Sequence, residues 1–201
     1  MFDAQIRPLI DRLLNPVGRE LAARGVTANH VTIIGVIFGL AAAVCVALQL
    51  FDFAFWFILL SRVADGLDGA VARASRATDF GGYLDVVCDF VFYSAIPFAF
   101  AAAQPENALA SAFLIFSFIG TASSFLAFAI FAEKHNISTE IRGKKAFYYL
   151  GGLTEGAETI LLLLAMVTWP SYFIFMAFGF GLLCWVTTIT RVYAAYSQFS
   201  H

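Results

Sequence analysis

The chain has 201 residues, of which 61% are hydrophobic and only 13% are charged. A soluble domain of this length would carry about twice that charged fraction, so the composition excludes an ordinary soluble protein and indicates an integral membrane protein. The net charge of −2 carries little information, no nucleic-acid partner is expected, and no polar linker is long enough to separate two large domains.

Residues 1–29 form an amphipathic segment ahead of the first apolar run. Apolar residues recur in it at helical spacing: Ile6, Leu9, Ile10, Leu13, Leu14, Val17 and Leu21. This pattern predicts a helix that lies in the membrane interface or packs on the ends of other helices, and the two interpretations are compatible. Pro16 is expected to kink or divide the helix.

Residues 30–201 make up the predicted membrane domain. They contain six apolar runs, each near the roughly 20 residues that a spanning helix needs. The runs cover residues 30–50, 53–73, 80–103, 108–132, 147–168 and 170–194. The predicted fold is therefore all-α, with six transmembrane helices after the amphipathic one. Asn29 is a predicted N-cap for the first span, and Gly35 and Gly39 favour close helix packing there.

The basic residues cluster at one end of these runs. They are Arg7, Arg12, Arg19, Arg24, Arg73, Arg76, Lys134, Arg142, Lys144, Lys145 and Arg191, while Arg62 lies within the second run. The opposite connections, at 49–52, 104–107 and 169–170, contain no Lys or Arg. The positive-inside rule therefore predicts that both termini are cytoplasmic, and we expect a bacterial inner or cell membrane.

Four aspartates stand where the second run ends and the third begins. Asp65 and Asp68 are three residues apart, and Asp85 and Asp89 are four apart. Each spacing puts both acids on one helix face, and the short connection makes the helices antiparallel neighbours. Ionisable groups at membrane depth are costly and usually face a polar cavity. We therefore expect the four carboxylates to converge near the cytoplasmic surface.

Four unpaired carboxylates in a partly dry site would repel one another, so they would either share protons or bind cations. Hard oxygen ligands suit Mg²⁺ or Mn²⁺, and four acids are enough for two ions, an arrangement common in phosphoryl transfer. Gly69 and Ala72 leave room beside the acids, and Arg73 has a planar fork that matches a phosphate. Together these residues indicate a diphosphate site.

These residues resemble the signature of the CDP-alcohol phosphotransferases, the class I CDP-alcohol phosphatidyltransferase family: D-x₂-D-G-x₂-A-R, then G-x₃-D-x₃-D. All eight fixed positions are filled: Asp65, Asp68, Gly69, Ala72, Arg73, Gly81, Asp85 and Asp89. Only seven residues separate the two blocks, against about eight in the family. The segment from Thr27 to Thr32 is also similar to the entry of the family's first helix.

The resemblance implies a reaction in which a CDP-linked donor, usually CDP-diacylglycerol, gives its phosphatidyl group to a small alcohol and CMP leaves. It implies Asp65, Asp68, Asp85 and Asp89 as ligands of Mg²⁺ or Mn²⁺, and Asp89 as general base. It also implies a CDP site made by Asp65, Gly69, Ala72 and Arg73 together with Asn29 and Thr32. Similar proteins are often homodimers, so a homodimer is expected by analogy.

Several charged residues keep two interpretations. One set of basic residues either fixes the orientation of the protein in the membrane and attracts anionic lipid, or binds the acceptor. The set is Arg142, Lys144, Lys145 and Arg191. In the second case the acceptor is anionic, such as glycerol 3-phosphate or an inositol phosphate. Arg62 either pairs with the acids or holds a phosphate. Glu155 and Glu158 either bind acceptor hydroxyls or counter an arginine.

A cation or proton transporter could use the same buried acids. Transporters often contain internal repeats and place their acids near the bilayer midplane. This sequence has no internal repeat, and its acids lie at the ends of the apolar runs. The enzyme is therefore the favoured hypothesis.

Overall fold

The computed structural model describes residues 3–135 and 153–200, with the side chains of the first helix from residue 10 onward. This part of the chain is helical and contains no strand, which confirms the all-α class. Its elements are α1 (Asp3–Ala23), α2 (Ala28–Ala47), α3 (Phe51–Ala74), α4 (Asp79–Ala103), η1 (Pro105–Asn107), α5 (Ala108–Lys134), α7 (Gly156–Thr168), η2 (Pro170–Tyr172) and α8 (Phe173–Phe199).

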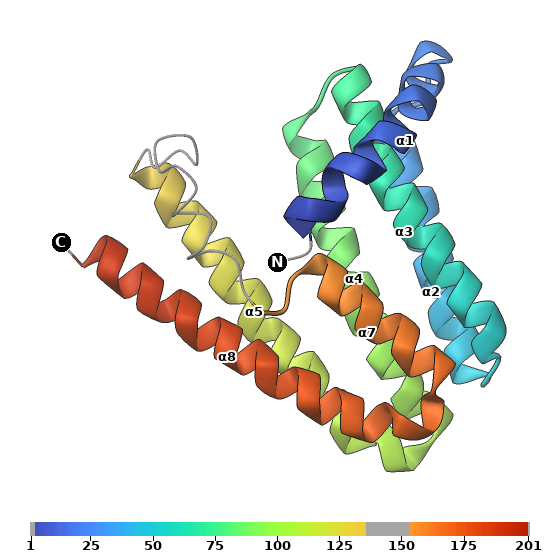
Figure 1. Cartoon of the computed structure of the whole chain (residues 1–201), viewed down its shortest axis with the longest axis vertical. Coiled ribbons are helices and arrows are strands. Elements are labelled where there is room, and N and C mark those ends of the chain that lie inside the picture. The colour runs from blue at the N-terminus through green and yellow to red at the C-terminus, as the bar shows by residue number, and fades with distance from the viewer. Residues whose placement is uncertain (1–2, 136–152, 201) are drawn as a thin grey trace.

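The helices fall into two groups that meet at one end of the molecule (Figure 1). In the first group α2 packs against both α3 and α4, and α1 packs against α3. In the second group α5 and α8 lie side by side, and they diverge from the first group toward the end where α3 stops and α4 begins. α7 packs against α3 and also contacts α8. The signature residues therefore lie at the end where the two groups are apart.

Among the described residues, four helical stretches are long and apolar enough to cross a bilayer: Ala28–Ala47, Asp79–Ala103, Pro105–Lys134 and Pro170–Phe199. α3 has sufficient length, with 24 residues, but it carries several charged side chains. α7 has only 13 residues, whereas a span over 147–168 was predicted, and residues 147–152 lie outside the described part. The membrane character is thus supported, and four of the six expected spans are long and apolar enough to cross a bilayer.

The N-cap prediction for α2 was wrong, and one of the two outcomes expected at Pro16 does not occur. The N-cap of α2 is Thr27 rather than Asn29, because the Thr27 hydroxyl accepts a hydrogen bond from the His30 amide while the His30 ring accepts one from the Thr27 amide. This reciprocal pair satisfies two otherwise orphaned donors. Pro16 does not divide the N-terminal segment, since α1 continues through it to Ala23.

Aromatic side chains fill the contact between the two groups of helices. The rings of Phe100 in α4 and Phe173 in α8 are stacked with centroids 4.1 Å apart, and both side chains are buried. Many other large apolar side chains are exposed, including Phe175 at 81% and Leu109 at 74%. A soluble protein rarely exposes so much apolar surface, so these faces fit a lipid environment.

Close packing of α2 through its glycines is confirmed. A Cβ atom at Gly39 would lie 2.6 Å from Cδ2 of Phe92 and 3.2 Å from the Ser61 hydroxyl. A Cβ atom at Gly35 would lie 3.2 Å from that of Ala64. The two glycines therefore let α2 approach α3 and α4 at the level of the acids.

We expect Gly39→Ala to lower the free energy of unfolding by about 1–3 kcal/mol, because the fully buried Phe92 ring has no room to move away from the added methyl group. The matched control is Gly179→Ala in α8, where an added Cβ would meet nothing within 4 Å. Unfolding of both variants in detergent micelles measures the effect. Equal stability of the two variants would contradict the packing role of Gly39.

Candidate active site

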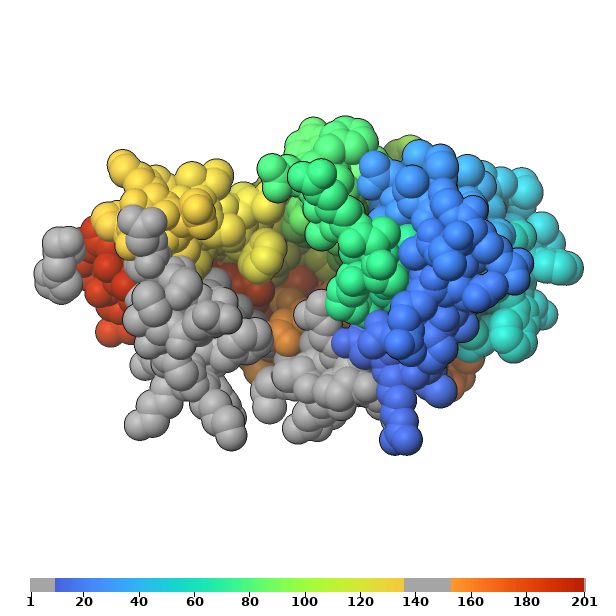
Figure 2. Space-filling model, turned by 90° about the horizontal axis from the view of Figure 1, so that it is seen from above, coloured from blue at the N-terminus to red at the C-terminus, as the bar shows by residue number. Residues whose placement is uncertain are grey.

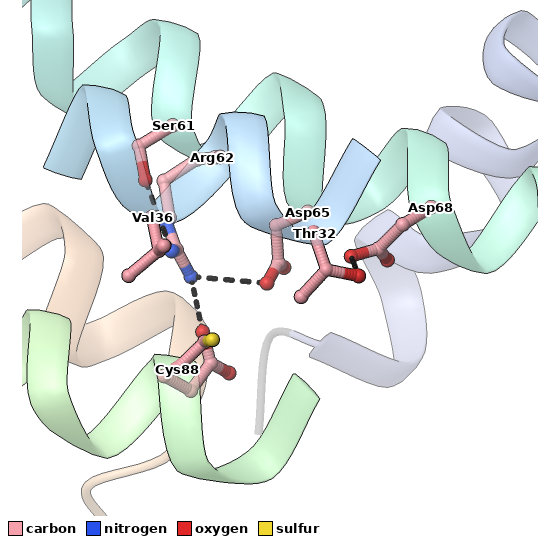
Figure 3. Close-up of a pocket in the computed structure, with 9 residues that line it drawn as sticks. Thr32, Val36, Ser61, Arg62, Asp65, Asp68 and Cys88 are labelled. Atoms are coloured by element: carbon pink, nitrogen blue, oxygen red, sulfur yellow. Dashed lines mark hydrogen bonds and ion pairs between the residues drawn. The ribbon is translucent and has the colours of Figure 1, made fainter. Parts of the chain in front are cut away.

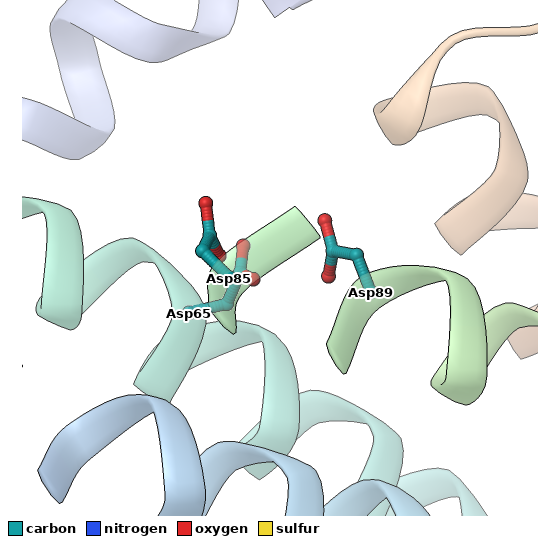
Figure 4. Close-up of side chains that lie close together, drawn as sticks. All are labelled: Asp65, Asp85 and Asp89. Atoms are coloured by element: carbon teal, nitrogen blue, oxygen red, sulfur yellow. The ribbon is translucent and has the colours of Figure 1, made fainter. Parts of the chain in front are cut away.

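Three of the four signature aspartates come together. One carboxylate oxygen from each of Asp65, Asp85 and Asp89 lies within 4.8 Å of the others. Asp65 projects from α3, and the other two project from the first half of α4 (Figure 4). Their spacing of four residues puts Asp85 and Asp89 on one face of α4. All three side chains are partly exposed, so the cluster is accessible.

The short connection between α3 and α4 brings the acids to the same level. α3 ends at Ala74, and α4 begins at Asp79 with Thr78 as its N-cap. The Thr78 hydroxyl accepts a hydrogen bond from the Gly81 amide at 3.0 Å. A side chain at Gly81 would come within 3.1 Å of both this hydroxyl and the Asn29 amide oxygen. The signature glycine therefore allows a tight start to α4.

Asp68 departs from the expected four-acid cluster. Its side chain is buried, and its Oδ2 accepts a hydrogen bond from the Thr32 hydroxyl of α2 at 2.6 Å (Figure 3). Asp68 lines the same cavity as Asp65 and Asp89, but it does not belong to the group of three. The hydroxyl of Thr32 thus holds this carboxylate beside the cluster rather than within it.

Arg62 pairs with the acids, as one of its two interpretations expected. Its Nη1 atom lies 2.7 Å from Oδ1 of Asp89 and 3.3 Å from Oδ1 of Asp65 (Figure 3). The guanidinium carbon lies 4.3 Å from the centre of the Phe92 ring and 5.7 Å from that of Tyr93. Only 12% of the side chain is exposed. Arg62 is therefore a fixed positive charge that bridges the two helices carrying the acids.

A small cavity lies beside these groups. It is lined by Thr32, Gly35, Val36, Ser61, Arg62, Asp65, Asp68, Cys88 and Asp89. Most of its polar lining comes from the signature acids, Arg62 and two hydroxyl groups. The sequence predicted the acids and Thr32, whereas Ser61 and Cys88 join the cavity because α3 and α4 cross α2 here.

Arg73 lies next to the signature glycine Gly69 and is held by α1. A Cβ atom at Gly69 would lie 3.2 Å from Nη1 of Arg73. The Nη2 atom of Arg73 donates to Oδ1 of Asp11 at 2.7 Å and to Oδ1 of Asn15 at 3.0 Å. These two partners of Arg73 were not predicted from the sequence. The signal available was their spacing of four residues on the polar side of the amphipathic helix.

The residues predicted to bind the acceptor do not join the acids in the described structure. Arg142, Lys144 and Lys145 lie outside the described residues. Arg191 is buried between α5 and α8, where its Nη1 donates to the Thr121 carbonyl oxygen at 3.0 Å. It lines a separate, largely apolar cavity of about 270 Å³.

Glu155 and Glu158 belong to the start of α7. The Glu155 amide donates to Oε2 of Glu158 at 3.3 Å, and the two residues form a reciprocal cap. Glu155 also interacts electrostatically with Arg191. These acids therefore serve helix capping, and Glu155 faces an arginine, as one of the two interpretations proposed.

Comparison with known proteins agrees with the signature. A family model described as CDP-alcohol phosphatidyltransferase matches residues 25–193. The chain is 49% identical to Inner membrane protein YnjF of Escherichia coli K12, over 98% of this chain and 96% of that protein. It is 36% identical to an archaetidylinositol phosphate synthase of Pyrococcus horikoshii, over 49% of this chain and 53% of that one.

A solved structure shows the same fold. The crystal structure of Mycobacterium tuberculosis phosphatidylinositol phosphate synthase with CDP-DAG bound matches with a TM-score of 0.67. The alignment covers 92% of this chain and 94% of that one, at 20% sequence identity. At this identity the likeness establishes the shared fold alone.

Proposed function

The chain belongs to the CDP-alcohol phosphatidyltransferase family and is an enzyme of that class, and we propose that it transfers the phosphatidyl group of CDP-diacylglycerol to an alcohol. The observation that carries this proposal is the convergence of Asp65, Asp85 and Asp89 within the family signature. The relative whose structure holds CDP-DAG, with the same fold, supports this choice of donor.

The acid cluster fits a divalent cation. It offers carboxylate oxygens from three residues within 4.8 Å of one another, and such hard ligands suit Mg²⁺ or Mn²⁺. Asp65, Asp85 and Asp89 would hold one metal ion, and Asp68, which lines the same cavity, would contribute to a second. When bound, the cations would neutralise the diphosphate and stabilise the charge on the transferred phosphoryl group.

Asp89 is the proposed general base. Arg62 contacts its Oδ1 atom, so Oδ2 is available to accept the proton of the acceptor hydroxyl. The alcohol oxygen then forms a bond to the phosphorus that carries diacylglycerol. The bond from that phosphorus to the oxygen of CMP breaks, and CMP leaves with the electron pair. Arg62 keeps Asp89 oriented for this step through their charge-assisted hydrogen bond.

The donor side of the site is proposed to include Gly69, Ala72 and Arg73. Gly69 keeps the space beside the Arg73 guanidinium free of a side chain. Asn29 and Thr32 are on α2 at the same end, and Thr32 contacts Asp68. The Arg73 fork would contact the diphosphate of the donor, since a guanidinium matches two phosphate oxygens at once.

We propose a phosphorylated polyol as acceptor, such as an inositol phosphate or glycerol 3-phosphate. The Pyrococcus horikoshii relative is named an archaetidylinositol phosphate synthase, and a relative from Mycobacteroides abscessus, 40% identical over 45% of this chain, is named a phosphatidylinositol phosphate synthase. In both products a phosphate accompanies the inositol. The basic residues Arg142, Lys144, Lys145 and Arg191 are the proposed contacts for the acceptor phosphate.

In the membrane, α3 and α7 are proposed to complete a set of six spans. The basic residues other than Arg62 then lie on the cytoplasmic side, together with both termini and the acid cluster. This orientation lets a water-soluble acceptor reach Asp89 while the acyl chains of the donor stay in the bilayer. α1 would lie in the cytoplasmic interface.

The test gives purified protein CDP-diacylglycerol, Mg²⁺ or Mn²⁺ and a panel of acceptors, and measures CMP release. The panel pairs each phosphorylated polyol with its unphosphorylated form. We expect metal-dependent CMP release that is faster with the phosphorylated member of a pair. The proposed donor reaction would be wrong if no acceptor gave CMP, and ion flux in protein-containing liposomes would then favour a transporter.

A further inference from the structure

The interface between α1 and α3 reaches the signature arginine. Asp11, Asn15 and Gly18 follow one another at intervals of four and three residues, so they share one face of α1. Gly66, Ala70 and Arg73 share one face of α3 in the same way. Figure 2 shows α1 (blue) against the segment that joins α3 to α4 (green) at this end of the molecule. The two faces meet, and the contact ends at Arg73.

Glycines fix how closely the two helices approach. A Cβ atom at Gly18 would lie 2.7 Å from the carbonyl carbon of Ala70, so only glycine fits there. A Cβ atom at Gly66 would lie 2.8 Å from a methyl group of Leu14. With the helices in contact at these points, the position of Asp11 and Asn15 relative to Arg73 is set by backbone packing.

We propose that Asp11 and Asn15 are positioning residues that hold Arg73 ready for the diphosphate of the donor. Both bonds use the Nη2 atom of Arg73. Within the described residues, Nε and Nη1 form no hydrogen bond that competes with a phosphate. The arginine is therefore anchored through Nη2, and its Nη1 atom lies beside Gly69. The proposal rests on the proposed function, in which Arg73 contacts the donor.

Another face of α1 explains why the helix lies at this level. Ile10, Leu13 and Val17 form a stripe at helical spacing, and they are 42%, 69% and 49% exposed. An exposed apolar stripe on an amphipathic helix fits the membrane interface. α1 would thus hold Arg73 at the depth where the diphosphate of a lipid-linked donor lies. Because the Arg73 side chain is already held in place, less of its conformational entropy would be lost when the donor binds.

The experiment compares Asp11→Ala and Asn15→Ala with Glu20→Ala. Glu20 pairs with Arg24 at 2.8 Å in an exposed ion pair, so its removal deletes an acid of α1 without touching Arg73. The Asp11 and Arg73 side chains are 32% and 42% exposed, so solvent weakens their pair. We expect about a three- to fivefold rise in KM for CDP-diacylglycerol in each of the first two variants. The kcat and the acceptor KM should stay within twofold, and Glu20→Ala should match the wild type.

A double-mutant cycle separates positioning from a structural role. In an Arg73→Ala background, Asp11→Ala should cause no further rise in donor KM, and Asp11→Glu in the native background should recover part of the loss. A loss that persists without Arg73 would overturn the proposal. A fall in donor KM would also overturn it, because Asp11 would then compete with the diphosphate.

A binding measurement keeps this proposal separate from the proposed reaction. If the wild type releases no CMP with any acceptor, the dissociation constant for CDP-diacylglycerol is measured directly for the wild type and the three α1 variants. A three- to fivefold weaker binding in Asp11→Ala and Asn15→Ala alone would then support the positioning role, even though the reaction had failed. Equal dissociation constants in all four proteins would reject it.

Discussion

Asp89→Asn should reduce CMP release by about 10³-fold, the range typical for the loss of a general base. An asparagine has the same shape as Asp89 and can still accept a hydrogen bond from Arg62, but it cannot take the proton of the acceptor. The measurement is the rate of CMP release at saturating donor, acceptor and Mg²⁺ or Mn²⁺. Any burst of CMP in the first turnover should disappear as well.

The control for this variant is Asp52→Asn. Asp52 is an exposed acid in the first turn of the same helix as Asp65, at the opposite end from the cluster. Its replacement removes the same charge and should leave turnover unchanged. If Asp89→Asn kept substantial turnover while folding normally, the role of general base would have to pass to another group, and Asp65 and Asp85 would be the candidates.

Removal of divalent cations should lower CMP release by at least about 10³-fold, since metal ions supply several kcal/mol of transition-state stabilisation in such reactions. Three carboxylates close together cannot by themselves neutralise a diphosphate, and among the described residues the single charge of Arg62 lies beside two of them. The measurement adds EDTA to the assay and then restores Mg²⁺ or Mn²⁺ in excess. Full activity in EDTA would contradict the metal site.

The Asp85→Asn variant tests whether the metal binds at the group of three aspartates. Asp85 belongs to the group of three but is not paired with Arg62 in the described structure, so its loss removes a ligand and leaves the Arg62 contacts in place. We expect the Mn²⁺ concentration for half-maximal activity to rise, and the binding of Mn²⁺, measured directly by its paramagnetic signal, to weaken in parallel. Asp52→Asn again provides the control.

Helical spacing was enough to predict the acid cluster, because Asp85 and Asp89 are four residues apart on one helix and the connection to α3 is short. The place of Asp68 could not be predicted in the same way. Its orientation depends on the Thr32 hydroxyl, and therefore on how α2 packs against α3. Spacing within one helix carries no information about that packing.

The remaining differences have similar physical causes. Thr27 and Asn29 are both good N-cap residues, and the His30 side chain decides between them by completing the reciprocal pair. Residues 147–168 were predicted as a span from hydropathy, but α7 begins only at Gly156, after a cap formed by Glu155 and Glu158. The bond between Asp11 and Arg73 joins residues 62 positions apart, and only the fold brings them together.

Phe92 links the chemistry to the membrane core. One face of its ring lies under the Arg62 guanidinium, and its edge touches Gly39 of α2. The size of this ring thus sets the distance between α2 and α4. It also sets the position of the Arg62 guanidinium that orients Asp89. Position 92 therefore cannot change freely during evolution. A substitution there that altered the packing of the membrane helices would also move Asp89, the proposed catalytic base.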